Sequence, residues 1–297
     1  MSLARMLANG APLLLDGGLS TQLELRGRRA DDALWTARVL LDDPQAVALA
    51  HGDFVEAGAQ IVITASYQVS REAFAAAGLS ASQADRALVA SVDVAREAVR
   101  GTHVLVAASL GPFGAVDHDG GEYRGRYGRS VDELASFHSA RLRVLMSAEP
   151  DLIAIETVPD VDEAAAVMQA LEHEMPVWVS FTAADDAHVR AGQSIEDAVL
   201  AVRGHPAVQA VGINCTEPSH VEGLLRRMGA VTDLPLLAYP NAGGSWDSTR
   251  RAWRGAARPA AEAVVDWTAA GARVVGGCCG TSAARIAEMS QALAATR

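Results

Sequence analysis

Three cysteines are the residues of this chain whose type and spacing indicate metal chemistry. Cys215 ends an apolar segment, and Cys278 and Cys279 stand side by side at the end of another. Neighbouring residues on a strand point to opposite faces, so a vicinal pair fills a core poorly. Gly276 and Gly277 precede the pair. Glycine can adopt dihedrals closed to other residues, so we expect these two to break the strand and let both thiols face one point.

Three thiolates suit Zn²⁺, which bonds sulfur at about 2.3 Å and keeps an open fourth position in catalytic sites. No C-x-x-C and no histidine close to a cysteine supplies a fourth ligand. We therefore predict an open zinc site on Cys215, Cys278 and Cys279. Alternatives remain at this point: Cys215 as a buried small hydrophobe, the pair as a vicinal disulfide or redox sensor, and "GGCCGTS" as a phosphate-binding turn.

Two carboxylates also follow apolar runs. Asp16 is either part of a site or the N-cap of a helix starting near Ser20. Glu156 ends the run "LIAIE". A buried isolated charge is costly, so Glu156 needs a partner, which is either a substrate ammonium group or one of the arginines.

The elements that must position these residues are short apolar runs separated by amphipathic helical patterns. Near-continuous apolar runs are typical of buried parallel strands. Eight β/α alternations predict a single (β/α)8 TIM-type barrel over residues 1–297, with the active site at the C-terminal ends of the strands. An open doubly wound sheet is the second interpretation, but no G-x-G-x-x-G follows the first strand. The predicted strands are 12–18, 60–66, 103–111, 151–157, 177–182, 210–215, 234–240 and 273–279. The predicted helices are 44–57, 81–99, 130–148, 160–174, 194–204, 218–229, 259–270 and 282–295.

Two connections, 111–129 and 241–259, are longer than the usual two to six residues of such loops. Both follow strand ends on the predicted active-site face, which indicates lids over a substrate. Ordered surface elaboration is the alternative.

Composition excludes several function classes. All 25 basic residues are arginine, which excludes Schiff-base and pyridoxal phosphate chemistry because both need a lysine amine. The net charge of −11 argues against a nucleic-acid surface. The apolar runs are too short to span a membrane, and no secretory signal is evident. We expect a cytoplasmic protein with small-molecule substrates and no nucleic-acid or membrane partner. The sequence leaves open whether the chain forms a homo-oligomer.

The motifs "GINC" (212–215) and "GGCCG" (276–280) resemble those of the zinc-dependent homocysteine S-methyltransferases. The resemblance extends over nearly the whole chain, through "LLLDGGLSTQLE", "AGAQIVITASYQ", "IAIETVP" and "YPNAG". The loop "EYRGRY" (122–127) is most similar to the branch that uses S-methylmethionine or S-adenosylmethionine as methyl donor. One departure is Gly280, where many members of that branch have arginine.

This resemblance implies a zinc ion on the three cysteines, with the homocysteine sulfur as fourth ligand. It implies that Asp16 and Glu156 hold the homocysteine amino group, and that Gly17, Gly18 and Asn214 contact its backbone end. Tyr67 matches a tyrosine that approaches the zinc when substrate is absent. We add that Tyr123, Tyr127 or Trp246 of the two long loops could stack on a sulfonium donor. Two other functions stay open. One is a zinc-dependent methyltransferase that acts on another thiol or a selenol, and the other is a barrel that binds zinc or senses redox state without catalysis.

Overall fold

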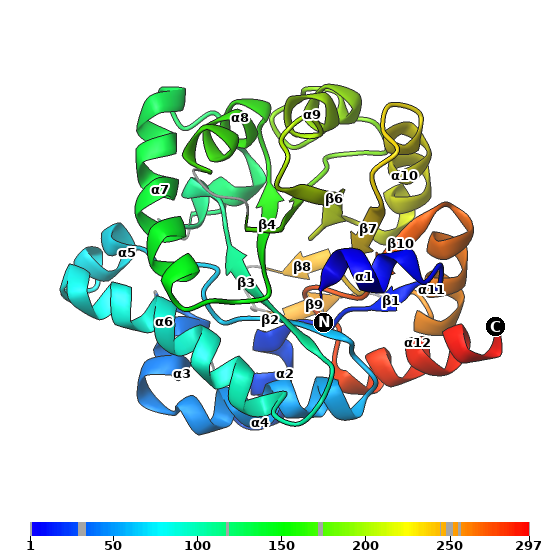
Figure 1. The fold of residues 1–297 in the computed structure, drawn as a ribbon, viewed down its shortest axis with the longest axis horizontal. Helices are drawn as coiled ribbons and strands as arrows, with labels where there is room; N and C mark the ends of the chain where they lie inside the picture. The colour runs from blue at the N-terminus through cyan, green and yellow to red at the C-terminus, as the bar shows by residue number, and fades with distance from the viewer. Residues whose placement is uncertain are drawn as a thin grey trace.

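The computed structural model describes residues 2–28, 34–116, 119–171, 175–243, 245–247, 252–254 and 257–296. Eight parallel strands form one sheet in the order β1-β10-β7-β6-β5-β4-β3-β2. A parallel bridge between Leu15 and Ile61 joins its two ends, so the sheet closes into a barrel surrounded by helices (Figure 1). The predicted barrel is confirmed and the open sheet is wrong. The strands are β1 (Leu13–Leu14), β2 (Ile61–Ile63), β3 (Leu105–Leu110), β4 (Leu152–Val158), β5 (Val177–Phe181), β6 (Val208–Asn214), β7 (Leu236–Tyr239) and β10 (Ala272–Val275).

The eight predicted helices are all present. In α4, the Asp43 side chain accepts a hydrogen bond from the Ala46 amide and Pro44 takes the first turn, as its sequence indicates. The helices are α4 (Pro44–Glu56), α6 (Ala81–Ala98), α7 (Val131–Ser147), α8 (Val161–Ala170), α9 (Ile195–Val202), α10 (Val221–Gly229), α11 (Ala260–Ala269) and α12 (Ala283–Ala295). The expected 218–229 helix begins with a 3₁₀ turn, η3 (Pro218–His220).

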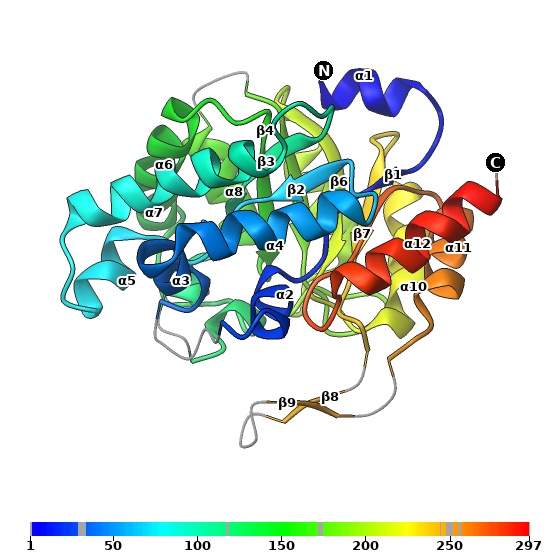
Figure 2. The same ribbon diagram turned by 90° about the horizontal axis from the view of Figure 1, so that it is seen from below.

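Several short elements were not predicted as such. Helices α1 (Leu3–Ala8), α3 (Thr36–Asp42) and α5 (Arg71–Ala76) add to the expected set, and α2 (Leu19–Leu25) starts near Ser20 as anticipated. Residues of α1 pack into the inner barrel core. Strands β8 (Ser245–Asp247) and β9 (Ala252–Arg254) form an antiparallel hairpin, and Figure 2 shows it at the end of the barrel away from α1.

The alternation of side chains along each strand decides which polar residues enter the barrel. In β4, Leu152 and Ala154 belong to the inner core, whereas Ile153 and Ile155 pack outward beneath the helices. The next residue on the inner face is therefore Glu156. The same alternation turns Ser109 of β3 and Asn214 of β6 inward. Among the described residues, no helix is long and apolar enough to cross a membrane.

Candidate active site

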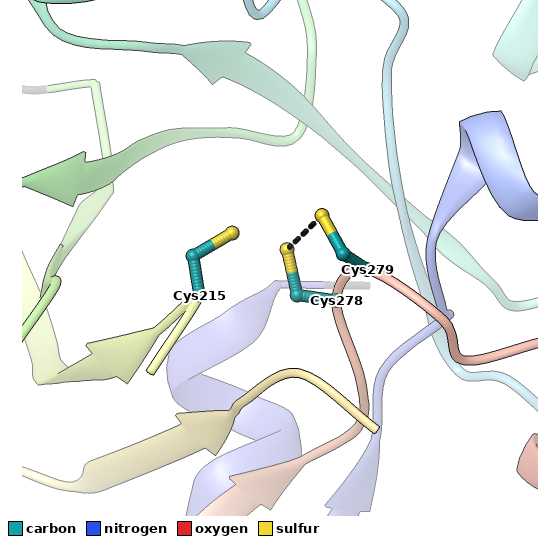
Figure 3. Close-up of side chains that lie close together, drawn as sticks. All are labelled: Cys215, Cys278 and Cys279. Carbon is teal, nitrogen blue, oxygen red and sulfur yellow. Dashed lines mark hydrogen bonds between the residues drawn. The ribbon is translucent and has the colours of Figure 1, made fainter. Parts of the chain in front are cut away.

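The sulfur atoms of Cys215, Cys278 and Cys279 all lie within 4.8 Å of one another. The Sγ atoms of Cys278 and Cys279 are 4.0 Å apart. Figure 3 shows the three side chains pointing toward a common space, one from the end of β6 and two from the segment after β10. Two sulfurs on a tetrahedral zinc with 2.3 Å bonds lie about 3.8 Å apart. The donor set therefore fits a metal ion that prefers thiolates, with only small shifts.

The glycines before the cysteine pair end the strand, but not for the reason that the sequence suggested. Strand β10 stops at Val275, and neither Gly276 nor Gly277 has a left-handed φ. A Cβ on Gly276 would lie 2.7 Å from the Leu15 Cβ, and one on Gly277 would lie 2.3 Å from Thr281 side-chain atoms. Close packing therefore requires these glycines. Cys215 itself has a φ of +46°, a strained conformation that redirects the chain at the end of β6.

Backbone hydrogen bonds fix the cysteine segment against its neighbours. The Cys278 amide donates to the Pro240 carbonyl at 2.8 Å, and the Ala242 amide donates to the Cys279 carbonyl at 2.9 Å. On the other side, Gly18 leaves no space for a side chain, since a Cβ there would lie 2.6 Å from the Cys278 carbonyl oxygen. The loops after β1, β7 and β10 thus form one packed unit. Hydrogen bonds from the Cys215 and Cys278 thiols hold the pKa of Cys279 well below its usual value.

A cleft of about 730 Å³, including its open mouth, lies at the three sulfurs. Its described lining contains no arginine or histidine, and its only charged side chains there are Glu122 and Glu156. The cleft brings together most of the residues that the sequence singled out: Gly17, Gly18, Tyr67, Tyr123, Glu156, Asn214, Cys215, Cys278 and Cys279.

Glu156 and Asp16 are both buried next to this cleft. Ser109 donates a hydrogen bond to Glu156, and burial raises the pKa of Glu156 to about 7. Asp16 accepts a hydrogen bond from the Ile63 amide through Oδ2 at 2.8 Å, while its buried Oδ1 has no partner among the described residues. Burial, and then the charge of Glu156, raise the pKa of Asp16 well above its usual value. Two buried carboxylates thus repel each other.

The alternative role of Asp16 as a helix cap is wrong. Gly18 is the N-cap of α2, and no side chain caps that helix. The arginine partner considered for Glu156 is also absent from the described lining of the cleft. Ser109 instead donates a hydrogen bond to Glu156.

Asn214 is held by a reciprocal pair with the end of β4. Its Oδ1 accepts from the Thr157 amide, and its Nδ2 donates to Thr157 Oγ1, both at 2.7 Å. Ser180 Oγ donates to the same Oδ1 at 2.8 Å. Thr157, like Cys215, has a positive φ, of +60°. Asn214 therefore ties together two strained residues at the cleft, and its Nδ2 has a second hydrogen.

A buried arginine positions Tyr67. The guanidinium of Arg141 donates to the carbonyls of Tyr67, Val69 and Gly111, at 2.7, 2.9 and 2.7 Å. A Cβ on Gly111 would meet the Tyr67 ring at 2.7 Å. The loops after β2 and β3 are thereby joined, and the Tyr67 ring is fixed against the cleft. Burial raises the pKa of Tyr67 well above its usual value, so its hydroxyl keeps its proton.

The aromatic residues proposed for the two long loops have different locations. Tyr123, in the 3₁₀ turn η2 (Gly121–Tyr123), lines the cleft, and the guanidinium carbon of Arg190 lies 5.4 Å from its ring centroid. Tyr127 is not brought to the cleft, because its hydroxyl donates to Glu163 and its ring packs on Phe113. The side chain of Trp246 lies outside the described residues.

Sequence reasoning missed several residues of the cleft. Glu122 and Trp35 line it, and Ser109 is the hydrogen-bond partner of Glu156. Ser109 was predictable, since it follows Leu105 and Ala107 at the two-residue period of an inward strand face. Glu122 lies in a single 3₁₀ turn and Trp35 directly precedes α3, so no periodic pattern gives the direction of either side chain.

Comparison with known proteins gives consistent matches over the chain. The family model described as homocysteine S-methyltransferase matches residues 13–293. A homocysteine S-methyltransferase of Escherichia coli is 40% identical over 291 residues, covering 93% of this chain and 94% of its own. One of Bacillus subtilis is 38% identical over 293 residues, covering 94% and 93%. The metallated form of the homocysteine methyltransferase MmuM from Escherichia coli superposes with a TM-score of 0.85, at 39% identity, and covers 96% of both chains.

Proposed function

Because this chain belongs to the homocysteine S-methyltransferase family, we propose that it transfers a methyl group from a sulfonium donor to homocysteine and releases methionine. The donor is S-methylmethionine, with S-adenosylmethionine as the alternative. The observation that carries the proposal is the group of three sulfurs within 4.8 Å in a cleft with no described basic side chain. Such a cleft suits one thiol substrate and cationic groups.

Cys215, Cys278 and Cys279 would hold one zinc ion. Three thiolates match the donor preference of Zn²⁺ and leave the fourth position that catalytic zinc sites keep open. A zinc ion there would keep the substrate thiol deprotonated at neutral pH, where a free thiol with a pKa near 8.5 is mostly protonated. The metallated form of MmuM supports a metal-dependent family.

Asp16 and Glu156 are assigned to the homocysteine ammonium group. Asp16 Oδ1 is buried without a partner among the described residues, and an ammonium group would satisfy it and relieve the repulsion between the carboxylates. Gly17, Gly18 and the second Nδ2 hydrogen of Asn214 are the proposed contacts of the backbone end of the substrate.

Tyr67 and Tyr123 both line the cleft. We assign to them the aromatic contact with the sulfonium group, and we leave Tyr127 out because its hydroxyl is bound to Glu163. In the transfer, a lone pair of the homocysteine sulfur forms the new S–CH₃ bond while the donor C–S bond breaks. The bonding electrons go to the donor sulfur, which becomes a neutral thioether. No proton moves, so the enzyme contributes alignment of the two sulfurs.

The test is an assay of methionine formation with the zinc content measured in parallel. Purified protein receives homocysteine with S-methylmethionine, S-adenosylmethionine or betaine. Methionine from a sulfonium donor is the expected result, and none from any donor at one zinc per chain would overturn the proposal.

The variant Cys279→Ser tests the metal ligands. Serine does not supply a thiolate, so we expect zinc content to fall below about a tenth per chain and activity to fall at least about 100-fold. Retained activity would contradict the assignment. The control is Ser136→Ala, on the exposed face of α7, which should change neither the zinc content nor the activity. Ser20 lines the cleft and is therefore unsuitable for a control variant.

A further inference from the structure

Glu122 is an acidic side chain in the cleft that the proposed reaction has not used. It lies in η2, next to Tyr123, and lines the cleft. Its Oε2 is fully buried and has no hydrogen-bond partner in the described part of the chain. A buried carboxylate oxygen without a donor is costly unless a ligand supplies one or brings a positive charge.

The surroundings of Glu122 add to the cost of its negative charge. Burial raises its pKa, and the charge of Cys215 adds to this effect. The charge of Glu122 in turn acts on Tyr67 and Cys279. The carboxylate therefore lies within electrostatic range of the sulfur end of the cleft. Arg124, which directly follows η2, is bound to Asp119 at 2.6 Å, and its charge offsets only part of this rise in the pKa of Glu122.

The backbone holds Glu122 at this place. Gly114 of η1 (Phe113–Ala115) packs directly on η2, and a Cβ there would lie 2.5 Å from the Glu122 amide nitrogen. The Gly121 amide donates to Asp119 Oδ1 at 2.9 Å, which closes the turn. The position of the carboxylate is thus built into the packing of the loop after β3.

We propose that Glu122 binds the positive charge of the methyl donor and makes the cleft selective for sulfonium donors. This inference rests on the proposed function and concerns its second substrate. Asp16 follows β1 and Glu156 lies in β4, and both are assigned to the ammonium group of homocysteine, whereas Glu122 lies in the loop after β3. It is the remaining acidic group in the described lining of the cleft.

The proposal also predicts which kinetic constant depends on Glu122. The donor sulfur is cationic before transfer and neutral afterwards, so attraction to Glu122 is strongest in the ground state and is lost in the product. Removing such an interaction raises KM without lowering kcat. Glu122 would therefore select the donor and favour release of the thioether product.

The experiment compares wild type with Glu122→Gln, which keeps the shape of the side chain and removes its charge. We expect the KM for S-methylmethionine to rise about 10-fold, as for loss of one charged hydrogen-bonding contact. The KM for homocysteine and the kcat should stay within about twofold. Glu122→Asp, which keeps the charge, should recover part of the donor affinity. Glu262→Gln, an exposed residue of α11, is the matched control.

Binding of methionine, a thioether with the same ammonium group, separates two roles of Glu122. Its affinity should be the same in wild type and Glu122→Gln; an equal loss for methionine would place the ammonium group at Glu122 and overturn the proposal. An unchanged donor KM in Glu122→Gln would also overturn it. Titration calorimetry with S-methylmethionine gives the same comparison without turnover, so failure of this inference can be distinguished from failure of the proposed function.

Discussion

At the scale of single residues, the cleft combines buried acidic groups with thiols and has no described basic side chain to balance them. Glu156, with a pKa of about 7, is 7% exposed. Asp16 is 1% exposed and its pKa is raised in the same direction. Burying these carboxyl groups costs stability, and under the proposed function the ammonium group of homocysteine would reduce that cost.

The first prediction concerns the pH dependence of stability. The folded state holds the Glu156 proton up to about pH 7, whereas the unfolded chain releases it near pH 4.3. Stability from this group is therefore full below the unfolded pKa and is lost as pH rises to about 7. The loss amounts to about 4 kcal/mol in the free energy of unfolding.

Urea unfolding of metal-free protein between pH 4 and 8 measures this loss. Glu156→Gln, which cannot titrate, should show a smaller decrease than wild type over the same range. The residual slope belongs to Asp16 and the other acidic groups. Equal slopes for the two proteins would show that Glu156 has an ordinary pKa.

At the scale of elements, the active site depends on the segment that follows β10. Backbone hydrogen bonds join this segment to the loops after β1 and β7. Gly276 and Gly277 of the segment pack so closely that neither position has space for a side chain. The left-handed Cys215 at the end of β6 completes the sulfur group. The end of β6 and the segment after β10 therefore carry the three thiols, and a shift in either should disturb metal binding before it disturbs the fold.

The second prediction tests this packing with Gly277→Ala. The added methyl group would lie 2.3 Å from the Thr281 side chain, so we expect a loss of about 1–3 kcal/mol in stability from overpacking. The segment must move, and zinc content should fall below about half an ion per chain.

Gly52→Ala is the matched control for this variant. Gly52 lies within α4, and a Cβ there has no neighbour within 4 Å. Alanine in a helix is favoured over glycine by roughly 0.5–1 kcal/mol, so this variant should be slightly stabilised at full zinc content. Full zinc content in Gly277→Ala would disprove the packing argument.

At the scale of the molecule, the barrel closes through the contact of its first two strands, where Leu15 and Ile61 form the last parallel bridge. The inner core joins residues of α1 to side chains from strands around the barrel. Because each strand depends on two neighbours, we propose that residues 1–297 form one domain, as the sequence predicts.

The third prediction follows from this closure. Calorimetry of the protein should give one endothermic transition, because no part of a closed sheet can unfold without exposing its neighbours. Zinc at 100 times its dissociation constant should stabilise the whole protein by about 2.7 kcal/mol and shift that transition as a unit. Two transitions, of which only one responds to zinc, would indicate separate domains.

The sequence by itself determined the eight strands, the eight main helices and the types of residue that do the chemistry. Apolar runs in strands and amphipathic periods in helices depend on local order, so they can be read along the chain. The short helices α1, α3 and α5, of six, seven and six residues, contain too few turns for a periodic signal.

Only the tertiary structure decided which side chains share the cleft. Glu122, Glu156 and Cys215 are far apart in sequence and line one cleft because the closed sheet brings strand ends and their loops to one face. The same closure placed Glu122 in the cleft and left Tyr127 bound to Glu163, although both belong to "EYRGRY". In an irregular loop the direction of a side chain is set by packing against distant segments, and no local pattern encodes it.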